Sequence, residues 1–542
     1  MSSPGSKMNK ASHAASAPVF VTEAAPRSIS FDERLASWRA WAAAVDWTPW
    51  MIIGLGAFLR VLLLGMKPLH FDEGINGWFV DQMTKNGFYR YDPTNYHGPF
   101  HFYVLFLAQT LFGRSAWALR IPVVLASISC IWLTFKFQPF VGRTAVSLAA
   151  LAMAVSPAYV FYGRYAIHEV WLLLFSMLFI LGALGLWRVG TRGYLWCLGM
   201  GVFGMILTKE TYIIHIGCGA IALLVAWISH KITPAADTKR APQQWDYADL
   251  IGVIAVGVAA LVIFYSGTFF NWAGLKGLYA TFDAWFKTGK EGNGHEKPWW
   301  YWLMLIGRYE WAIAAGLLAC AACQMFREIS VRYLAIYGVG TLMAYSIVAY
   351  KTPWCIISIV WPLLFVFGAA VALVPAKSQR AGLIVAAVIL VISLGQSVRL
   401  NYYQATTDTE PYVYVQTYND IYRLTEPLLE LARRNPTYYQ LVGNMVRTSA
   451  YPFPWILGDF PRIGYYERDN LPTPLDADFL LVQEDKIQEV ESKLQNSYYT
   501  VPLTIRPYQD TSRVYFSAKV FKDFFPGRVP EFAGKGGADV FP

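Results

Sequence analysis

Apolar runs of roughly 18 residues or more recur through the first 400 residues of this chain. A run of that length crosses the hydrocarbon core of a bilayer as a single helix. Over its 542 residues the chain is 55% hydrophobic and only 15% charged, whereas a soluble protein carries about 25% charged residues. The sequence therefore predicts a polytopic membrane protein and excludes an ordinary soluble domain for most of its length.

We expect about eleven transmembrane helices, each matching one apolar run. They lie near 48–66, 117–137, 143–162, 169–187, 194–210, 211–229, 247–270, 301–323, 333–350, 354–375 and 381–398. The segment 98–113 is apolar but only about 16 residues long, which is short for a span. Whether it crosses the membrane or lies in the interface sets the side of every loop after it.

The basic residues favour one threading. If 98–113 lies in the interface and the N-terminus is cytoplasmic, nearly all basic residues of the short loops fall on the cytoplasmic side, as the positive-inside rule requires. These residues are Lys136, Arg143, Arg188, Arg192, Lys231, Lys239, Arg240, Arg327, Arg332, Lys377 and Arg380. The formal net charge of +9 then reflects topology. We expect a multi-pass protein of the plasma (inner) membrane, with the lipid bilayer and no nucleic acid as partner.

The two ends of the chain differ from its middle. Residues 1–30 are rich in Ser, Ala and Pro and predict a disordered cytoplasmic tail. Residues 31–46 have the spacing of an amphipathic helix lying on the membrane. The transmembrane domain then covers 47–400, and 401–542 predicts a soluble α/β domain on the non-cytoplasmic side. In that domain, helix-like stretches near 418–434 and 485–495 alternate with strand-like runs such as "DFLLV" and "RVYFSAKVF".

The six cysteines all fall in or beside apolar segments, which supports no disulfide framework. Cys320 and Cys323 form a CxxC inside an apolar run without partner His or Cys, so we interpret them as small packing residues.

Five polar clusters reach one face of the predicted bundle, away from the cytoplasm. They are "HFDEG" (70–74), "YGRYAIHE" (162–169), "TKET" (208–211), "GNGHEKPWW" (292–300) and "YKTPW" (350–354). One ionisable residue at a span end can be a snorkelling side chain. Five clusters on one side indicate a site, because ionisable groups at membrane depth are costly.

The order of these motifs resembles the GT-C membrane glycosyltransferases. "HFDEG" follows the first span, then come "YDPTNYHGPFHFYVLFLAQTLFG", "WALRIP" and "SPAYVFYGRYAIHEVWLL". This arrangement is similar to protein O-mannosyltransferases and to the aminoarabinose transferases of lipid A. "YHGP", "HEKPWWYW", "YKTPW" and "YPFPWILGDFPRIGYYE" are closest to a prokaryotic branch described as flippase-activity-associated membrane proteins.

The resemblance implies an inverting enzyme that takes a sugar from a polyprenyl-phosphate donor and passes it to an acceptor on the non-cytoplasmic face. Asp72 matches the acid of the first external loop, a catalytic base or acceptor-orienting group, and Glu169 matches the second acid. Where mannosyltransferases place a basic-Pro-Pro element, this chain has His97-Gly98-Pro99, so the acceptor is left open among protein, lipid and polysaccharide.

The chemistry needs a base, cations on the leaving phosphate, and contacts to the sugar and acceptor. Either Asp72 or Glu73 could be the base from its position, but adjacent side chains diverge and only one can face the site. The candidate phosphate-binding cations are Arg60, Arg164, Lys209 and Lys351. The candidate substrate-binding residues are Glu73, His97, His168, Glu210 and His295.

Two further questions stay open at this level. Asp72 and Glu169 could instead hold a divalent cation such as Mg²⁺ or Mn²⁺, because carboxylate oxygens suit both metals; no other cofactor is indicated. The alternatives to a transferase are a flippase, or a flippase accessory protein, for lipid-linked sugars, and a scaffold whose tail binds a partner. No repeat typical of transporters is visible in the sequence, and a scaffold needs no five polar clusters.

Overall fold

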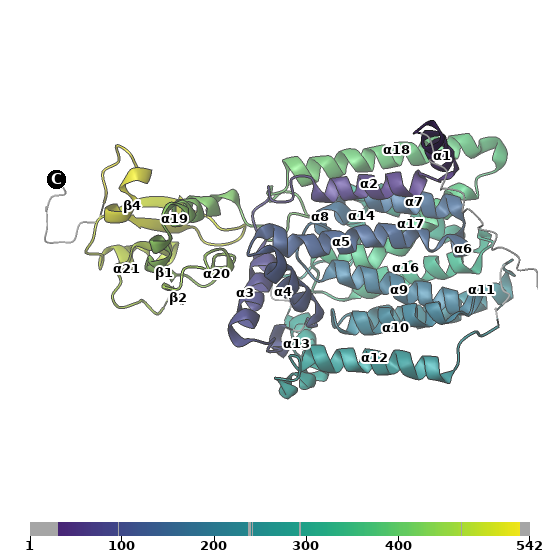
Figure 1. The fold of residues 1–542 in the computed structure, drawn as a ribbon, viewed down its shortest axis with the longest axis horizontal. Coiled ribbons are helices and arrows are strands. Elements are labelled where there is room, and N and C mark those ends of the chain that lie inside the picture. The colour runs from purple at the N-terminus through teal and green to yellow at the C-terminus, as the bar shows by residue number, and fades with distance from the viewer. Residues whose placement is uncertain are drawn as a thin grey trace, which may run out of the picture. The chain divides into compact units, whose positions relative to one another are not determined.

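The computed structural model describes residues 31–95, 97–236, 240, 242–291, 294–467 and 469–531 (Figure 1). The predicted tail 1–30, Lys239 and part of the "GNGHEKPWW" cluster lie outside the described residues. Helix α1 (Phe31–Ala44) belongs to a compact unit of its own, which ends at Trp47. It is a helix, as the spacing in 31–46 predicts, and its Phe31 and Trp38 side chains are exposed.

The second unit begins at Thr48 and contains a large bundle of helices, several of which run side by side in Figure 1. Its apolar helices are α2 (Thr48–Val61), α4 (Phe100–Phe112), α5 (Ala116–Phe135), α7 (Arg143–Val155), α9 (Glu169–Arg188), α10 (Arg192–Ile206), α11 (Tyr212–Ile232), α12 (Tyr247–Tyr265), α14 (Tyr301–Tyr309), α15 (Trp311–Ala319), α16 (Ile329–Ile347), α17 (Ile356–Ala372) and α18 (Gln379–Val398). The connecting elements are α3 (Phe71–Asn86), η1 (Pro93–Asn95), α6 (Gln138–Val141), α8 (Pro157–Tyr162), η2 (Trp272–Lys276), α13 (Gly277–Glu291), η3 (Cys320–Met325), η4 (Pro353–Cys355), η5 (Ala376–Ser378) and η6 (Arg399–Tyr403).

Every apolar run that predicts a span forms one helix or two. Within the described residues, six helices are long and apolar enough to cross a membrane, or seven if one bent pair counts as a span. Three others are shorter apolar helices: α2, α4 and α7. Length and hydropathy together therefore support fewer crossings than the eleven runs predict, because several runs form helices of fewer than 18 residues.

One predicted span, 301–323, is not a single helix. Helices α14 and α15 meet at an angle of 118°. Glu310 stands at the break, where its side chain accepts hydrogen bonds from Ser156 Oγ at 2.6 Å and from the backbone N–H of Ala158 at 2.8 Å. The buried carboxylate thus satisfies donors at the start of α8, while the chain bends around it.

Helix α4 agrees with the interfacial placement of 98–113. Its 13 residues span about 20 Å, less than the hydrocarbon core. Both of its ends lie near α3: His97 and Asp72 line the same cavity, and Arg114 pairs with Asp81 at 2.7 Å. The helix therefore begins and ends at the same end of the bundle.

After the bundle, the chain forms a five-stranded mixed sheet in the order β2-β1-β3-β5-β4. Strands β1 (Gly443–Val446), β2 (Ile463–Tyr466) and β3 (Phe479–Gln483) are parallel, and β5 (Ser512–Ser517) runs antiparallel between β3 and β4 (Tyr498–Leu503). The helical elements of this region are η7 (Asn419–Ile421), α19 (Tyr422–Arg434), η8 (Pro436–Gln440), α20 (Phe453–Ile456), η9 (Glu484–Lys486), α21 (Ile487–Glu491), α22 (Ala518–Phe521) and η10 (Lys522–Phe524). The predicted fold class, a helical membrane domain followed by a C-terminal α/β domain, is confirmed.

The sheet region contacts the bundle through α3. A Cβ on Gly74 would lie 2.6 Å from Pro452, so only glycine allows this approach of α20. Trp455 donates from its indole N–H to Gln109 at 3.3 Å, and its backbone carbonyl accepts from Arg114. These contacts place the C-terminal region against α3, the segment that follows α2.

Candidate active site

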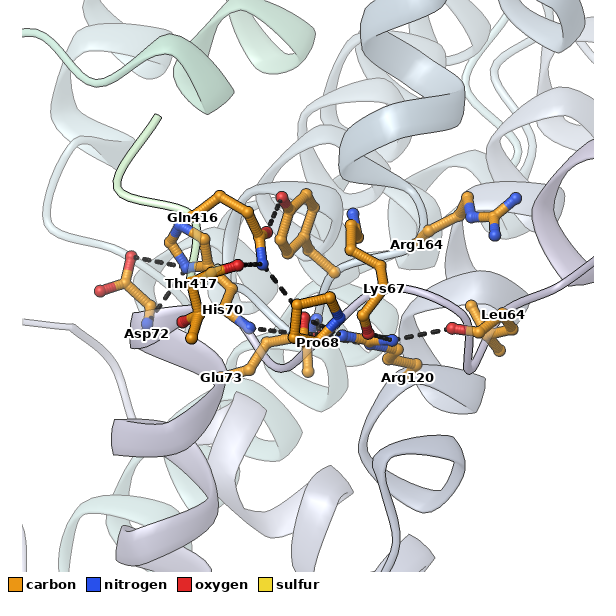
Figure 2. Close-up of polar contacts among 12 residues, drawn as sticks. Leu64, Lys67, Pro68, His70, Asp72, Glu73, Arg120, Arg164, Gln416 and Thr417 are labelled. Atoms are coloured by element: carbon orange, nitrogen blue, oxygen red, sulfur yellow. Dashed lines mark hydrogen bonds and ion pairs between the residues drawn. The ribbon is translucent and has the colours of Figure 1, made fainter. Parts of the chain in front are cut away.

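The "HFDEG" turn is built around a buried ion pair. Glu73 is fully buried and accepts from Arg120 Nε at 2.8 Å and Nη2 at 2.7 Å, a two-pronged contact drawn in Figure 2. The other guanidinium donors of Arg120 bind the backbone carbonyls of Leu64, Lys67 and Pro68. Burial alone raises the pKa of Glu73, but the charge and hydrogen bonds of Arg120 outweigh it and hold that pKa at about 2.

The same turn starts helix α3 and directs Asp72 away from Glu73. His70 and Glu73 form a capping box, in which His70 Nδ1 accepts from the backbone N–H of Asp72 at 3.1 Å and Glu73 accepts from the backbone N–H of His70 at 2.9 Å. His70 Nε2 donates to the Tyr414 carbonyl at 2.9 Å. The ring is therefore neutral, and burial lowers its pKa despite the nearby Asp72 carboxylate.

The Asp72 carboxylate has no comparable buried ion pair among the described residues. Its side chain is 32% exposed and lies 3.8 Å from a His70 nitrogen that already accepts a backbone hydrogen bond. The two adjacent acids thus have different environments. Glu73 is fixed in the protein interior, and Asp72 faces a cavity.

Two of the distant motifs are hydrogen-bonded to each other. His97 and Lys209 form an isolated bridge, in which the Gly98 N–H donates to the Thr208 carbonyl at 3.0 Å. A Cβ on Gly98 would lie 2.2 Å from the Leu207 carbonyl oxygen, so this close approach requires glycine. The side chains meet as well, with His97 Nδ1 3.2 Å from Glu210.

A second bridge joins the last two clusters. Glu296 pairs with Tyr350, and the Lys351 N–H donates to the His295 carbonyl at 3.1 Å. The Lys351 ammonium donates to the Lys297 carbonyl at 3.1 Å and to the Val348 carbonyl. Lys351 therefore stabilises this pair of loops and has one remaining donor.

All five polar clusters contribute to one cavity of about 660 Å³. Each cluster supplies a charged or titratable side chain: Asp72, Glu169, Lys209, His295 and Lys351. His97, His168 and Glu210 line it too. The cavity is large enough for a sugar and a phosphate group.

A buried ion pair lines the cavity. Glu169 begins helix α9 and pairs with Lys209, and both side chains are buried. Cys355 Sγ lies 3.7 Å from the Lys209 ammonium and 3.7 Å from the Glu169 carboxylate. Because the two charges balance each other, Lys209 can meet an incoming phosphate only by sharing its hydrogen bonds with Glu169.

The C-terminal region supplies a cation that no sequence motif indicates. Arg506 lines the cavity, and its guanidinium lies 3.6 Å from the centre of the Phe71 ring, one residue before Asp72. Among the described residues it has no hydrogen-bond partner. Burial lowers the pKa of Arg506 to about 10, partly offset by the Asp72 charge, so the group stays positive at neutral pH.

Two predicted phosphate-binding residues do not line the cavity. Arg60 is fully buried and donates to Ser127 Oγ at 2.7 Å and to carbonyls of α2, α7 and α8. Arg164 donates to the Leu59 and Leu63 carbonyls and covers the Tyr402 ring. Glu73, predicted to bind substrate, is engaged by Arg120. The structure gives all three residues packing contacts inside the protein.

Metal binding has little support from the residues nearby. Among the described residues, no group of three or more His, Cys, Asp or Glu side chains is arranged to hold a metal ion. A cation between Asp72 and Glu169 would need further oxygens from substrate, and Glu169 already pairs with Lys209. A metal at these two acids stays a prediction.

Comparison with known proteins agrees with the fold. Residues 96–264 match the sequence family described as dolichyl-phosphate-mannose-protein mannosyltransferase. The crystal structure of ArnT from Cupriavidus metallidurans bound to undecaprenyl phosphate is similar, with a TM-score of 0.58 at 15% identity, over 88% of this chain and 98% of that chain. The apo state of the same protein gives a TM-score of 0.59 at 15% identity, over 89% and 99% of the two chains. No curated protein sequence matches the chain.

This likeness shows the fold, which is of the GT-C type seen in ArnT, extending over nearly the whole chain. The chain is therefore a multi-pass membrane protein that resembles the mannosyltransferases and ArnT, as its motifs indicate.

Proposed function

We propose that the protein is a glycosyltransferase that uses a polyprenyl-phosphate-linked sugar. The observation that carries this proposal is the convergence of all five polar clusters on one cavity, with an unanchored carboxylate, Asp72, beside cations. The match to a mannosyltransferase family and the fold of a protein bound to undecaprenyl phosphate support the same reaction class.

In this proposal Asp72 is the general base. It takes the proton of the acceptor hydroxyl while that oxygen attacks the anomeric carbon, and the bond between that carbon and the phosphate oxygen breaks. The configuration inverts, and polyprenyl phosphate leaves with the electron pair. The half-exposed Asp72 can reach a substrate, whereas Glu73 cannot because both of its oxygens accept hydrogen bonds from Arg120.

The cations hold the phosphate. Lys209 is buried between the end of α10 and the start of α11, where the headgroup of a lipid carrier would lie. Arg506 approaches from the C-terminal region and has free donors for a second anionic oxygen. Glu169 orients Lys209, and His97, His168, Glu210 and His295 are placed to contact sugar or acceptor hydroxyls.

We further propose that this cavity faces the non-cytoplasmic side. The basic loops that predict the cytoplasmic side lie at the other end of the bundle. Residues at the starts of α9 and α11 line the cavity, whereas Trp187 and Lys231 lie in the last turns of these two helices. A divalent cation, if the enzyme uses one, would bind Asp72 and Glu169 together with substrate oxygens.

The test uses the purified full-length protein and polyprenyl-phosphate sugars labelled in the sugar. Membranes from a strain lacking the protein provide protein, lipid and polysaccharide fractions as acceptors. We expect label to enter one fraction and an equal amount of polyprenyl phosphate to be released. If the label stays on its carrier with every fraction, but proteoliposomes that contain the protein move the labelled carrier across the bilayer, the flippase hypothesis replaces this proposal.

A further inference from the structure

A second cavity lies at the opposite end of helices α9 and α11. Its volume is about 990 Å³. The catalytic cavity is lined by the first residue of α9, Glu169, and by Ile214 near the start of α11. The second is lined by Trp187 and Lys231, which lie in the last turns of the same two helices. About 20 helical residues, or roughly 30 Å, separate the two.

The charge of this second cavity has one sign. His230, Lys231 and Arg240 line it, and no Asp or Glu is among the described residues of its lining. Neither Lys231 nor Arg240 forms an ion pair with any residue that the structure describes. His230 Nδ1 accepts from the Ala235 N–H at 3.0 Å, which leaves its Nε2 to donate into the cavity.

The rest of the lining is apolar and aromatic. Leu223 and Leu224 are each 57% exposed, on a helix of which only 28% is buried inside the protein. Trp187, Trp227 and Trp245 surround the basic groups. Exposed leucines on a spanning helix face lipid tails, and tryptophans mark the depth of the headgroups.

The walls of the cavity are fixed by hydrogen bonds. The Gln244 N–H donates to the Gly190 carbonyl at 2.9 Å, which ties the loop before α12 to the end of α9. Arg332 donates to the Thr233 carbonyl at 2.6 Å and holds the end of α11. Tyr333 lies at the floor and donates to the Gly219 carbonyl at 3.2 Å. The lining is thus held in place without a ligand.

We propose that this cavity binds an anionic phospholipid from the leaflet at the basic end of the bundle. Lys231, Arg240 and the Nε2 of His230 contact the headgroup phosphate, and an acyl chain lies along Leu223 and Leu224. Basic pockets between membrane helices bind anionic headgroups in this way. Three basic groups without an acid among the described lining residues favour an anion over the zwitterionic lipids that fill most bilayers.

The test compares wild-type protein with the double variant Lys231→Gln/Arg240→Gln. Purified protein is titrated with phosphatidylglycerol or phosphatidylcholine of identical chains, and the bound lipid is counted by native mass spectrometry. We expect wild-type protein to prefer phosphatidylglycerol, and the variant to bind it roughly thirtyfold more weakly because two cations near the headgroup are lost.

Lys377→Gln/Arg380→Gln is the matched control. It removes two basic residues at the same end of the bundle, and neither lines either cavity. The control and the charge-preserving variant Lys231→Arg/Arg240→Lys should both bind like wild type. Equal phosphatidylglycerol binding by wild type and the Gln variant overturns the proposal. So does a preference of this site for polyprenyl phosphate or inorganic phosphate over phosphatidylglycerol.

Discussion

The two cavities at the ends of α9 and α11 use charge in different ways. In the first, three carboxylates stand among cations and histidines, and two of them have close partners, Glu169 with Lys209 and Glu210 with His97. In the second, basic groups face an apolar groove in which the structure describes no acid. Paired, buried charges suit a reaction in which protons and phosphate move. Unpaired cations among lipid-facing side chains suit the retention of an anion.

A similar contrast exists beside the first cavity, between two adjacent acids of which only Asp72 lines it. Glu73 is fully buried and bound by Arg120, whereas Asp72 is partly exposed and free to change partners. Burial and ion pairing therefore distinguish the acid that stabilises the fold, Glu73, from the acid that can react, Asp72, although the two are adjacent in the sequence.

The largest effect on folding is expected at Glu73. Glu73→Gln leaves the Arg120 charge buried without a counter-charge, which costs about 3–5 kcal/mol of folding free energy. The unfolding midpoint in detergent measures this loss. Asp72→Asn is the matched control and should shift the midpoint little, because Asp72 makes no buried pair. A stable Glu73→Gln protein would remove the distinction between the two acids.

Acid sensitivity sharpens the same comparison. The pKa of Glu73 falls from 4.5 to about 2 on folding. A depressed carboxyl pKa stabilises the fold above pH 4.5, and this contribution is lost as the pH falls from 4.5 towards 2. We expect wild-type protein to lose stability over that window and Glu73→Gln to show a smaller loss, read from unfolding midpoints at each pH.

A large effect on donor binding is expected at Lys209. Lys209→Gln removes the cation nearest the proposed phosphate and should weaken binding of a polyprenyl-phosphate sugar about a hundredfold, since charge-assisted hydrogen bonds are the strong ones. Lys209→Arg should retain part of the affinity. A comparable loss in Arg60→Gln, measured by the same equilibrium binding, would point to the interior cation instead.

A smaller effect is expected at Arg506, which touches the cavity from outside the bundle. Arg506→Ala should lower kcat/KM for transfer about tenfold, the loss of one charge-assisted contact. Arg506→Lys should recover part of the rate, and Arg423→Ala, at the exposed start of α19, is a control outside the cavity lining. No change in Arg506→Ala would show that the C-terminal region does not contact substrate.

The orientation of the two ends gives a qualitative test. Cysteine at Lys85, in the last turn of the helix α3 that begins at the first cavity, and at Lys231, in the second cavity, should react with an impermeant thiol reagent from opposite sides of the membrane. We expect labelling at position 85 in intact cells and at 231 only after permeabilisation, each measured over the wild-type background. The reverse pattern would invert the threading.

The sequence predicts much of this arrangement. Apolar run lengths predict the helices, and the bias of basic residues together with polar clusters at span ends predicts where the site lies. The bend at Glu310 cannot be predicted from the sequence, because it depends on hydrogen bonds with Ser156 and Ala158, which are far away in the chain. Arginine is a common phosphate ligand, so Arg60 and Arg164 are reasonable candidates from the sequence. In the fold, however, their guanidinium groups donate to backbone carbonyls that are distant in the chain.

The contacts between motifs are a second limit. "YHGP" and "TKET" each indicate a site, but nothing in either predicts that Gly98 would bind Thr208. Arg506 lies in "TIRPYQD", a stretch with no local signal of function. Its role follows from the approach of the C-terminal region to Phe71, which depends on long-range packing.

The central claim is that Asp72 is the base of a sugar transfer. The most direct measurement compares transfer and donor binding in wild type and Asp72→Asn, with labelled polyprenyl-phosphate sugar and the acceptor fraction that wild type labels. Asn keeps the shape but cannot accept a proton, so we expect transfer to fall about 10²–10⁴-fold while donor affinity is unchanged. Excess Mg²⁺ or Mn²⁺ should not restore the rate. Transfer at the wild-type rate by Asp72→Asn would contradict the account.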